Sequence, residues 1–373
     1  MSTGLVQGRV CVDISSDILK ENYHKISSAV APLGVISVLK ANAYGLGVEA
    51  IAKLLVQEGT SAIAVAELAE GMAILDLPCI KLILGTLLPC EFETAIEKGF
   101  HIPLCNYEQA EQYDAIAKRL GCKAFCHIAL DTGMSRVGFD ALSCEEDILR
   151  CSRLENIELV GMFSHFPQAY DGDEGSLQQI ELYKKVLSVL EANNINLAWR
   201  HIANSDAINN LPEACKAPFT HVRTGINLYG SFDVVGKRAL DLKPVLSIKT
   251  QLGQVKLVKA GRSIGYGRTY TCPRDMLVGV VAAGYADGLP LALSNRGSLL
   301  INGVLCPVLG RVCMDYTMVS LEQIPTAKAG DEVVCIGSSG NHSITIEDWA
   351  NLKATHPYEV LCAIGSRAVR RMV

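Results

Sequence analysis

The stretch KAFCHIALDTG, residues 123–133, is a short apolar run that ends in a polar turn. Nearly all of its successive residues are apolar, which is typical of a parallel β-strand buried on both faces. Similar runs occur at residues 34–39, 61–65, 80–84, 100–104, 158–163, 198–202 and 220–223. Amphipathic stretches lie between them, at residues 48–58, 66–75, 107–120 and 176–192. Strands alternating with helices predict an α/β fold, a (β/α)₈ TIM barrel, with a doubly wound open sheet as the second interpretation.

The pattern changes after about residue 240. Strand-like runs with few helices between them follow, at residues 245–252, 277–283, 298–301, 304–309, 316–321 and 332–336. Turn residues such as Asn302-Gly303 punctuate these runs. We therefore expect a barrel over residues 11–240, followed by a mostly β C-terminal domain over 241–373 that residues 1–10 join.

Composition excludes several classes of protein. The chain has 373 residues and a net charge of −5, without a basic cluster, which argues against nucleic acid or an anionic membrane as a partner. No apolar run approaches the roughly 18 residues of a membrane-spanning helix, and the start does not resemble a signal peptide. The 14 cysteines are scattered and form no C-x-x-C pair, so we expect reduced thiols and no metal site. These features indicate a cytoplasmic protein.

Polar residues follow five of the predicted strands, where a barrel carries its chemistry. They are Lys40 and Tyr44, then Asp131 and Arg136, then His165, then His201 and Ser205, and finally Arg223 and Gly225. Each alone has an ordinary explanation, such as a surface lysine or a turn glycine. Together they match the needs of pyridoxal phosphate, which takes a lysine amine, a phosphate cup and a partner for its ring nitrogen. The last two loops of a barrel commonly hold phosphate.

Several longer motifs carry a family resemblance. VLKANAYG, residues 38–45, closely resembles the cofactor-lysine signature of the alanine racemases. In the same order as in that family, the chain continues with HIANS (201–205), RTGINLYG (223–230), GYG (265–267), GYADG (284–288) and GRVCMD (310–315). The resemblance spans about residues 10–370. It implies a barrel plus a β domain, pyridoxal 5'-phosphate and a homodimer with shared active sites.

The function implied by the resemblance is interconversion of L- and D-alanine by a two-base mechanism on a pyridoxal phosphate aldimine, which supplies D-alanine for cell-wall peptidoglycan. Lys40 would carry the cofactor and act as a base on one face of the substrate Cα. The partner's Tyr285 would act on the opposite face, because racemisation removes a proton from one face and delivers it to the other. His165 and Arg223 match the residues that lower the pKa of this tyrosine.

The resemblance also implies the binding residues. Arg223 would contact the pyridine nitrogen and keep it unprotonated, since an arginine does not readily give up its proton. Arg136 would bond the phenolic oxygen and hold the substrate carboxylate together with the backbone N–H of the partner's Met314. The remaining cofactor-binding residues are Tyr44, Asn204, Ser205, Gly225, Ile226 and Tyr358. Tyr358 and Tyr285 would narrow the entrance.

The chain departs from the family at a few positions. Many members have a carbamylated lysine two residues before the Asp-Thr-Gly motif, where it orients the arginine, but this chain has Ala129. An unpaired buried guanidinium is costly. We therefore predict that a small anion, chloride, lies beside Arg136. Residues 166–171, FPQAYD, also depart from the family's pattern, and we expect this loop to affect access to the site.

Alternatives remain open at this point. A racemase that prefers serine or another amino acid would use the same machinery, although Tyr358 favours a small pocket. A non-catalytic regulatory protein that binds pyridoxal phosphate would share the barrel and the lysine, but it would lack a β domain with Tyr285. The chain could also be the catalytic part of a larger, membrane-tethered racemase.

Overall fold

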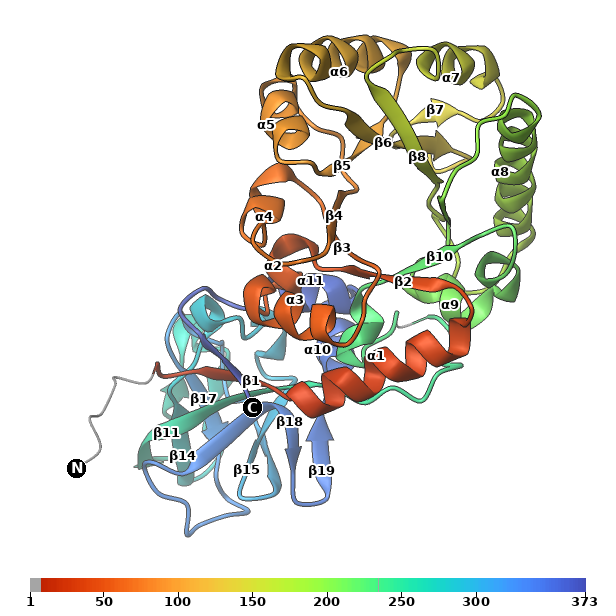
Figure 1. The fold of residues 1–373 in the computed structure, drawn as a ribbon. Helices are drawn as coiled ribbons and strands as arrows, with labels where there is room; N and C mark the ends of the chain where they lie inside the picture. The colour runs from red at the N-terminus through yellow and green to blue at the C-terminus, as the bar shows by residue number, and fades with distance from the viewer. Residues whose placement is uncertain (1–7, 234) are drawn as a thin grey trace. The chain divides into compact units, whose positions relative to one another are not determined.

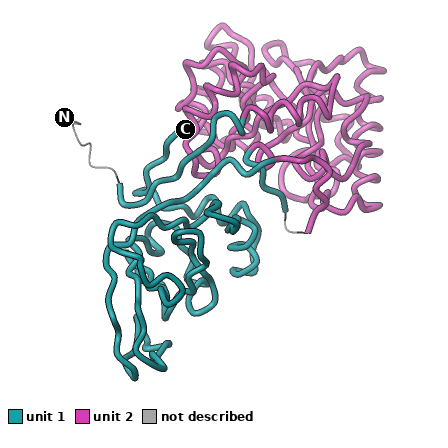
Figure 2. The backbone as a smooth tube through the Cα atoms, turned by 90° about the horizontal axis from the view of Figure 1, so that it is seen from below, with its two compact units in different colours: residues 1–19, 229–234, 243–373 teal, residues 20–228, 235–242 magenta. Residues whose placement is uncertain are grey.

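The computed structural model describes residues 8–233 and 235–373, and the chain forms two compact units (Figure 2). The barrel unit comprises residues 20–228 and 235–242, and the β unit comprises residues 1–19, 229–234 and 243–373 so far as they are described. The expectation for residues 1–7 lies outside the described residues.

The barrel unit is built around eight parallel strands (Figure 1). In sheet order they are β10 (His221–Thr224), β2 (Gly34–Val38), β3 (Ala62–Val65), β4 (Ile80–Ile83), β5 (His101–Leu104), β6 (Ala124–Asp131), β8 (Ile157–Phe163) and β9 (Trp199–His201). The two ends of this sheet meet, because the Thr220 amide donates to the Arg200 carbonyl at 2.9 Å. The sheet is therefore a nearly closed barrel, which confirms the predicted fold class over the open sheet.

Helices follow the strands and lie outside them (Figure 1). They are α1 (Ser16–Val30), α2 (Lys40–Tyr44), α3 (Val48–Gln57), α4 (Leu68–Met72), α5 (Phe92–Glu97), α6 (Tyr107–Leu120), α7 (Glu145–Cys151), α8 (Glu174–Ala192) and α9 (Ser205–Asn210). Asn106 and Asp173 cap α6 and α8 with their side-chain oxygens. The helix α4 is shorter than the predicted 66–75, since Glu67 is extended and Gly71 weakens the helix.

The interior of the barrel has two different sides. The side formed by β2, β3 and β4 is aliphatic, with Ile36, Val38, Ala62, Ala64 and Leu82 packed together. The side formed by β5, β6, β9 and β10 contributes histidine and tryptophan rings instead, and the indole of Trp199 stacks on His221 with ring centroids 4.0 Å apart. Three histidine rings of this second side are in contact with one another and, through His201, with Arg223.

The β unit contains a second large sheet. Its main order is β16 (Val304–Pro307), β15 (Ser298–Ile301), β18 (Glu332–Ser339), β11 (Leu246–Val258), β1 (Cys11–Ile14) and β20 (Val369–Met372). It also includes β14 (Met276–Val281), β17 (Thr317–Ser320) and β19 (His342–Ile344), and the helices α10 (Ile346–Lys353) and α11 (Pro357–Cys362) follow. A mostly β domain after the barrel is thus confirmed. In the part of the chain that the structure describes, no helix has the length and apolar character to cross a membrane.

The barrel was expected to begin at residue 11, but the structure places the boundary between the β unit and the barrel unit further along the chain. The strand β1 pairs antiparallel with β11 and parallel with β20. Only alternate residues of β1 are buried, Val12 and Ile14, which is typical of a strand with one exposed face and not of a barrel strand. The chain passes from the β unit into the barrel unit between Leu19 and Lys20, within α1.

Candidate active site

Lys40 stands just after β2 and begins an unusual turn. Residues 41–44 all have φ between 53° and 57°, in the left-handed region that residues with a Cβ avoid at a cost of about 1–2 kcal/mol each. Two side chains hold this turn. Glu70 accepts from the amides of Ala41 and Ala66, and the side-chain oxygen of Asn42 accepts from the Val48 amide at 2.8 Å. Backbone strain of this kind clusters at functional sites.

Three residues from separate elements bring polar atoms together near the end of β10. The amide of Gly225 donates to the hydroxyl of Ser205 at 3.0 Å. A Cβ at Gly225 would lie 2.2 Å from the hydroxyl oxygen of Tyr44, so any larger residue there would displace this hydroxyl. Asn204 caps the short helix α9 by accepting from the Ala207 amide at 2.9 Å. Ile226 follows Gly225 and is buried.

The guanidinium of Arg223 is buried and held by neutral acceptors. Its Nη1 donates to Nδ1 of His201 at 2.9 Å and to the carbonyl of the same residue at 3.0 Å. Its Nη2 donates to the carbonyls of Ser164 at 2.7 Å and Ile202 at 3.0 Å, and to Nδ1 of His165 at 3.1 Å. Within the described residues these five bonds leave Nε without a partner. Burial lowers the pKa of Arg223 to about 10, so the group stays charged at neutral pH.

His165 shows that four of the predicted site residues converge. Loss of hydration lowers the pKa of His165 well below its usual value, and the charges of Arg223, Arg136 and Lys40 lower it further. A like charge disfavours the charged form of a histidine when it lies nearby. His165 is therefore neutral at neutral pH and lies among three cationic side chains that come from the ends of three different strands.

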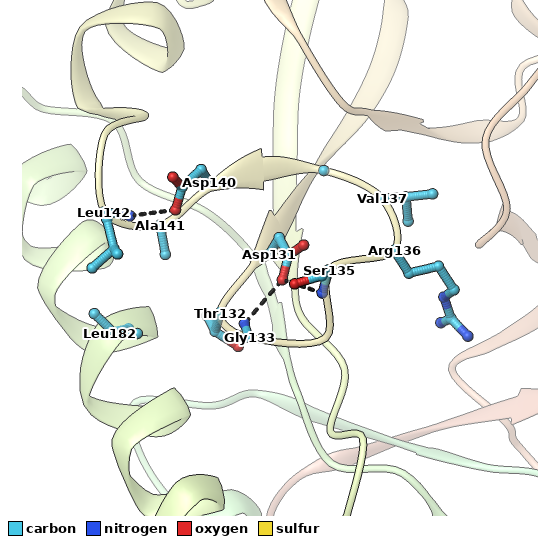
Figure 3. A pocket seen from close by; sticks show the side chains of 11 residues that line it. Asp131, Thr132, Gly133, Ser135, Arg136, Val137, Asp140, Ala141, Leu142 and Leu182 are labelled. Atoms are coloured by element: carbon cyan, nitrogen blue, oxygen red, sulfur yellow. Dashed lines mark hydrogen bonds between the residues drawn. The ribbon is translucent and has the colours of Figure 1, made fainter.

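Arg136 lies on the loop after β6, and this loop is held by Asp131. One carboxylate oxygen of Asp131 accepts from the amides of Gly133, Met134 and Ser135 at 2.9–3.0 Å. The loop lines a hollow of about 550 Å³ that extends to Leu142 and Leu182. The side chain of Arg136 extends from the loop away from these two leucines (Figure 3). Within the described residues, Arg136 forms no ion pair with a carboxylate.

The other predicted site residues belong to the β unit. Tyr285 is 43% exposed and Met314 is 51% exposed, and their loops are joined because the amides of Tyr285 and Ala286 donate to the carbonyls of Cys313 and Met314. A Cβ at Gly284 would lie 2.2 Å from the carbonyl of Cys313, so glycine is required for this approach. Tyr358 lies on α11, half-buried.

Two family models match the chain, one over each part of it. The model of the alanine racemase N-terminal domain matches residues 14–233, and that of the alanine racemase C-terminal domain matches residues 245–372. The chain belongs to the alanine racemase family. The second match does not favour a non-catalytic binding protein, which would lack this domain.

Curated alanine racemases are similar to the chain over nearly its whole length. The alanine racemase of Carboxydothermus hydrogenoformans is 38% identical over 370 residues, which cover 97% of this chain and 98% of that protein. Alanine racemase 2 of Caldanaerobacter subterraneus subsp. tengcongensis is 37% identical over 367 residues, which cover 96% of this chain and 93% of that protein.

Solved structures of alanine racemases have the same fold. The enzyme of Clostridium difficile 630 gives a TM-score of 0.92 at 34% identity, covering 98% of this chain and 95% of that one. The alanine racemase of Bartonella henselae, described with covalently bound pyridoxal phosphate, gives 0.87 at 28% identity, covering 98% of this chain and 99% of that one.

Sequence reasoning missed several residues of this alanine racemase site. Glu70 supports the lysine turn from α4, and Gln179 donates from α8 to the hydroxyl of Thr132 at 2.9 Å and to the carbonyl of His165 at 3.3 Å. His127 lies inside a predicted strand, and its ring lies within hydrogen-bonding distance of His201. The signal for His127 was a polar residue inside an otherwise apolar strand.

Proposed function

We propose that the protein interconverts L- and D-alanine with pyridoxal 5'-phosphate held in the barrel, and with Lys40 and Tyr285 as the two bases. The observation that carries this proposal is the convergence of Lys40, Arg136 and Arg223 around His165, in a chain of the alanine racemase family. When it is bound to the substrate amine, pyridoxal phosphate supplies a conjugated ring that withdraws electrons from Cα and acidifies its proton.

The residues present fit this cofactor. Arg223 has one nitrogen, Nε, that is free of partners within the described residues, and this N–H is suited to the lone pair of a pyridine nitrogen. The hydroxyls of Tyr44 and Ser205 and the backbone of Gly225 offer small polar groups for a phosphate at the last barrel loops. We assign further phosphate contacts to Asn204, Ile226 and Tyr358.

Lys40 would be joined covalently to the cofactor and would exchange a proton with one face of the substrate Cα at Nζ. The strained turn that follows it is held by Glu70 and Asn42, which keeps the backbone from which the lysine side chain starts at a defined position. We assign Arg136 to the substrate carboxylate and the phenolic oxygen, because a guanidinium binds a carboxylate with two parallel hydrogen bonds.

His165 would stabilise the ionised form of the second base. Arg223 can only donate, so Nδ1 of His165 must accept, and the neutral ring carries its proton on Nε2. An N–H at Nε2 can donate to a phenolic oxygen and stabilise its ionised form. We propose that the phenol is Tyr285 of the partner subunit, acting on the face of Cα opposite to Lys40.

Exposed residues of the β unit support a dimer. Tyr266, Tyr285, Met314 and Tyr316 are each between 43% and 66% exposed. The amide of Tyr285 donates to the carbonyl of Cys313, next to Met314, so several of these exposed side chains lie on neighbouring loops. Large apolar side chains that gather on a surface mark interaction sites. We propose a homodimer in which the partner's Tyr285 and the partner's Met314 complete each active site.

The proposed role of the activity is to supply D-alanine for peptidoglycan in the cytoplasm. The 14 cysteines are free thiols, buried or partly buried for the most part, which suits a reducing compartment.

We expect alanine to be the preferred substrate. Tyr358 would occupy space that a longer side chain needs, whereas a serine hydroxyl is rejected only by about 10²-fold in an apolar pocket. The measurement is kcat/KM for each enantiomer of alanine, serine and lysine, with alanine highest in both directions. A Tyr358→Ala variant is the matched control, and we expect it to narrow the difference between alanine and serine. Preference for serine or lysine in the unmodified protein would contradict the assignment.

We also propose that chloride lies beside Arg136, where Ala129 replaces a longer side chain and no carboxylate of the described residues pairs with the guanidinium. Crystals grown with bromide should show anomalous density next to Arg136, and activity should respond to halide at constant ionic strength. Substituting Ala129→Glu should remove both effects, since a carboxylate would replace the anion. Arg136 found bonded to a protein carboxylate, without bromide, would rule out the anion and leave the racemase assignment unchanged.

A further inference from the structure

A chain of three histidines runs through the barrel from Arg223. The first link is the bond from Nη1 of Arg223 to Nδ1 of His201, at 2.9 Å. Next, Nε2 of His201 lies 3.2 Å from Nδ1 of His127. Finally, Nε2 of His127 lies 2.9 Å from Nδ1 of His101. These residues come from β10, β9, β6 and β5, and the last of them, His101, is half-buried at the start of its strand.

The three rings are neutral at physiological pH. Burial lowers the pKa of His127 and of His201 well below the usual value, and both side chains are fully buried. Burial likewise lowers the pKa of His101 to about 4. A neutral imidazole has one nitrogen that donates and one that accepts.

The contacts of Arg223 and of the three rings with one another allow only one assignment of donor and acceptor nitrogens. A guanidinium only donates, so Nδ1 of His201 accepts and Nε2 carries the proton. That proton must be given to Nδ1 of His127, whose own proton is therefore on Nε2 and is given to His101. All three rings are fixed as the Nε2–H tautomer, with the lone pairs facing Arg223.

We propose that His127 and His101 are positioning residues, which hold His201 in the tautomer that accepts from Arg223 and so orient the guanidinium toward the cofactor ring. This inference rests on the proposed function, in which Arg223 contacts the ring nitrogen. Among the described residues, the five acceptors of Arg223 are all neutral, so its charge is balanced there by oriented dipoles and not by a carboxylate. A reversed His201 would point an N–H at the guanidinium and break one of these five bonds.

The first test is neutron diffraction from deuterated crystals of the protein as purified. We expect deuterium on Nε2 of His201, His127 and His101, and none on Nδ1 of these rings. Deuterium on Nδ1 of any of the three would overturn the proposal. This result does not depend on racemisation. If the proposed function were wrong, the three tautomers would still be as described. If the tautomers were wrong, the proposed function would still stand.

The second test compares two substitutions at His127 in the loaded enzyme. Leucine removes both hydrogen bonds, whereas glutamine can still accept from His201 and donate to His101. We expect His127→Leu to lower kcat about tenfold, the effect of losing about one hydrogen bond, with little change in KM and with a shifted absorption band of the bound cofactor. His127→Gln should restore most of kcat and the original band.

A control variant and a replacement pair accompany this comparison. His221 lies in the same barrel but is not one of the three linked histidines, and its ring contacts the hydroxyl of Thr220. We therefore expect His221→Gln to change kcat less than about twofold. If His127→Leu does not fold, the pair His101→Phe and His101→Gln at the half-buried end serves the same purpose. Equal kcat for the apolar and the glutamine variants, or an equal loss for His221→Gln, would overturn the proposal.

Discussion

Replacing Lys40 by alanine should lower kcat for alanine racemisation by at least about 10⁴-fold, because one change removes both the covalent attachment of the cofactor and a base at Cα. We do not expect another lysine to replace it, since Lys40 stands at the start of the left-handed turn at residues 41–44, which Glu70 holds by accepting from the Ala41 amide. Two measurements check this: kcat for each enantiomer, and the mass of the Lys40 peptide after borohydride reduction of the unmodified protein, which should gain the mass of the reduced cofactor.

The matched control for this change is Lys53→Ala. Lys53 is an exposed residue of α3, a short distance along the chain from the turn, and its loss should leave kcat unchanged within about twofold. Cofactor mass on another peptide, or activity of Lys40→Ala above about 1% of the original with the fold intact, would show that Lys40 does not have the assigned role.

Mixing two inactive variants should restore activity if each active site is shared between subunits. A Lys40→Ala chain retains Tyr285, and a Tyr285→Phe chain retains Lys40. In a dimer of one of each, one site lacks both residues and the other has both. With free exchange of subunits, about half of the dimers are mixed, so about a quarter of the original activity should return. Each variant alone should remain far below this level.

The control for mixing is a pair that cannot complement. Lys40→Ala mixed with a double variant, Lys40→Ala with Tyr285→Phe, should stay inactive at every ratio. Subunit exchange must be shown independently, for example by native mass spectrometry of chains of different mass. Proven exchange without recovered activity would mean that Tyr285 does not act in the partner's site.

Much of the fold was predictable because parallel strands buried on both faces have a strong sequence pattern. All eight barrel strands begin within one residue of the predicted runs, as β6 does at Ala124. The strand β1 was assigned to the barrel because four residues of alternating burial carry too little pattern to show their partners. Its pairing with β11 and β20 joins residues that are more than 200 positions apart.

The site was predictable where it depends on strand ends and not where it depends on side-chain geometry. Lys40, His165 and Arg223 follow or end strands, so barrel topology alone brings them together. The left-handed turn after Lys40 was not predictable, since the alanine, asparagine and tyrosine residues at 41–44 do not ordinarily adopt four such φ values in succession. The histidine chain depends on which residues of β5, β6 and β9 face inward, and a single apolar run does not reveal this.

The most direct test of the central claim is to follow L-alanine and D-alanine in D₂O with the purified protein. Two bases on opposite faces of Cα predict that each enantiomer is converted into the other, and that the product carries deuterium at Cα from the first turnover while the remaining substrate keeps its proton. No interconversion of the enantiomers would contradict alanine racemisation. Interconversion in which the product keeps the original proton would contradict the two bases, Lys40 and the partner's Tyr285.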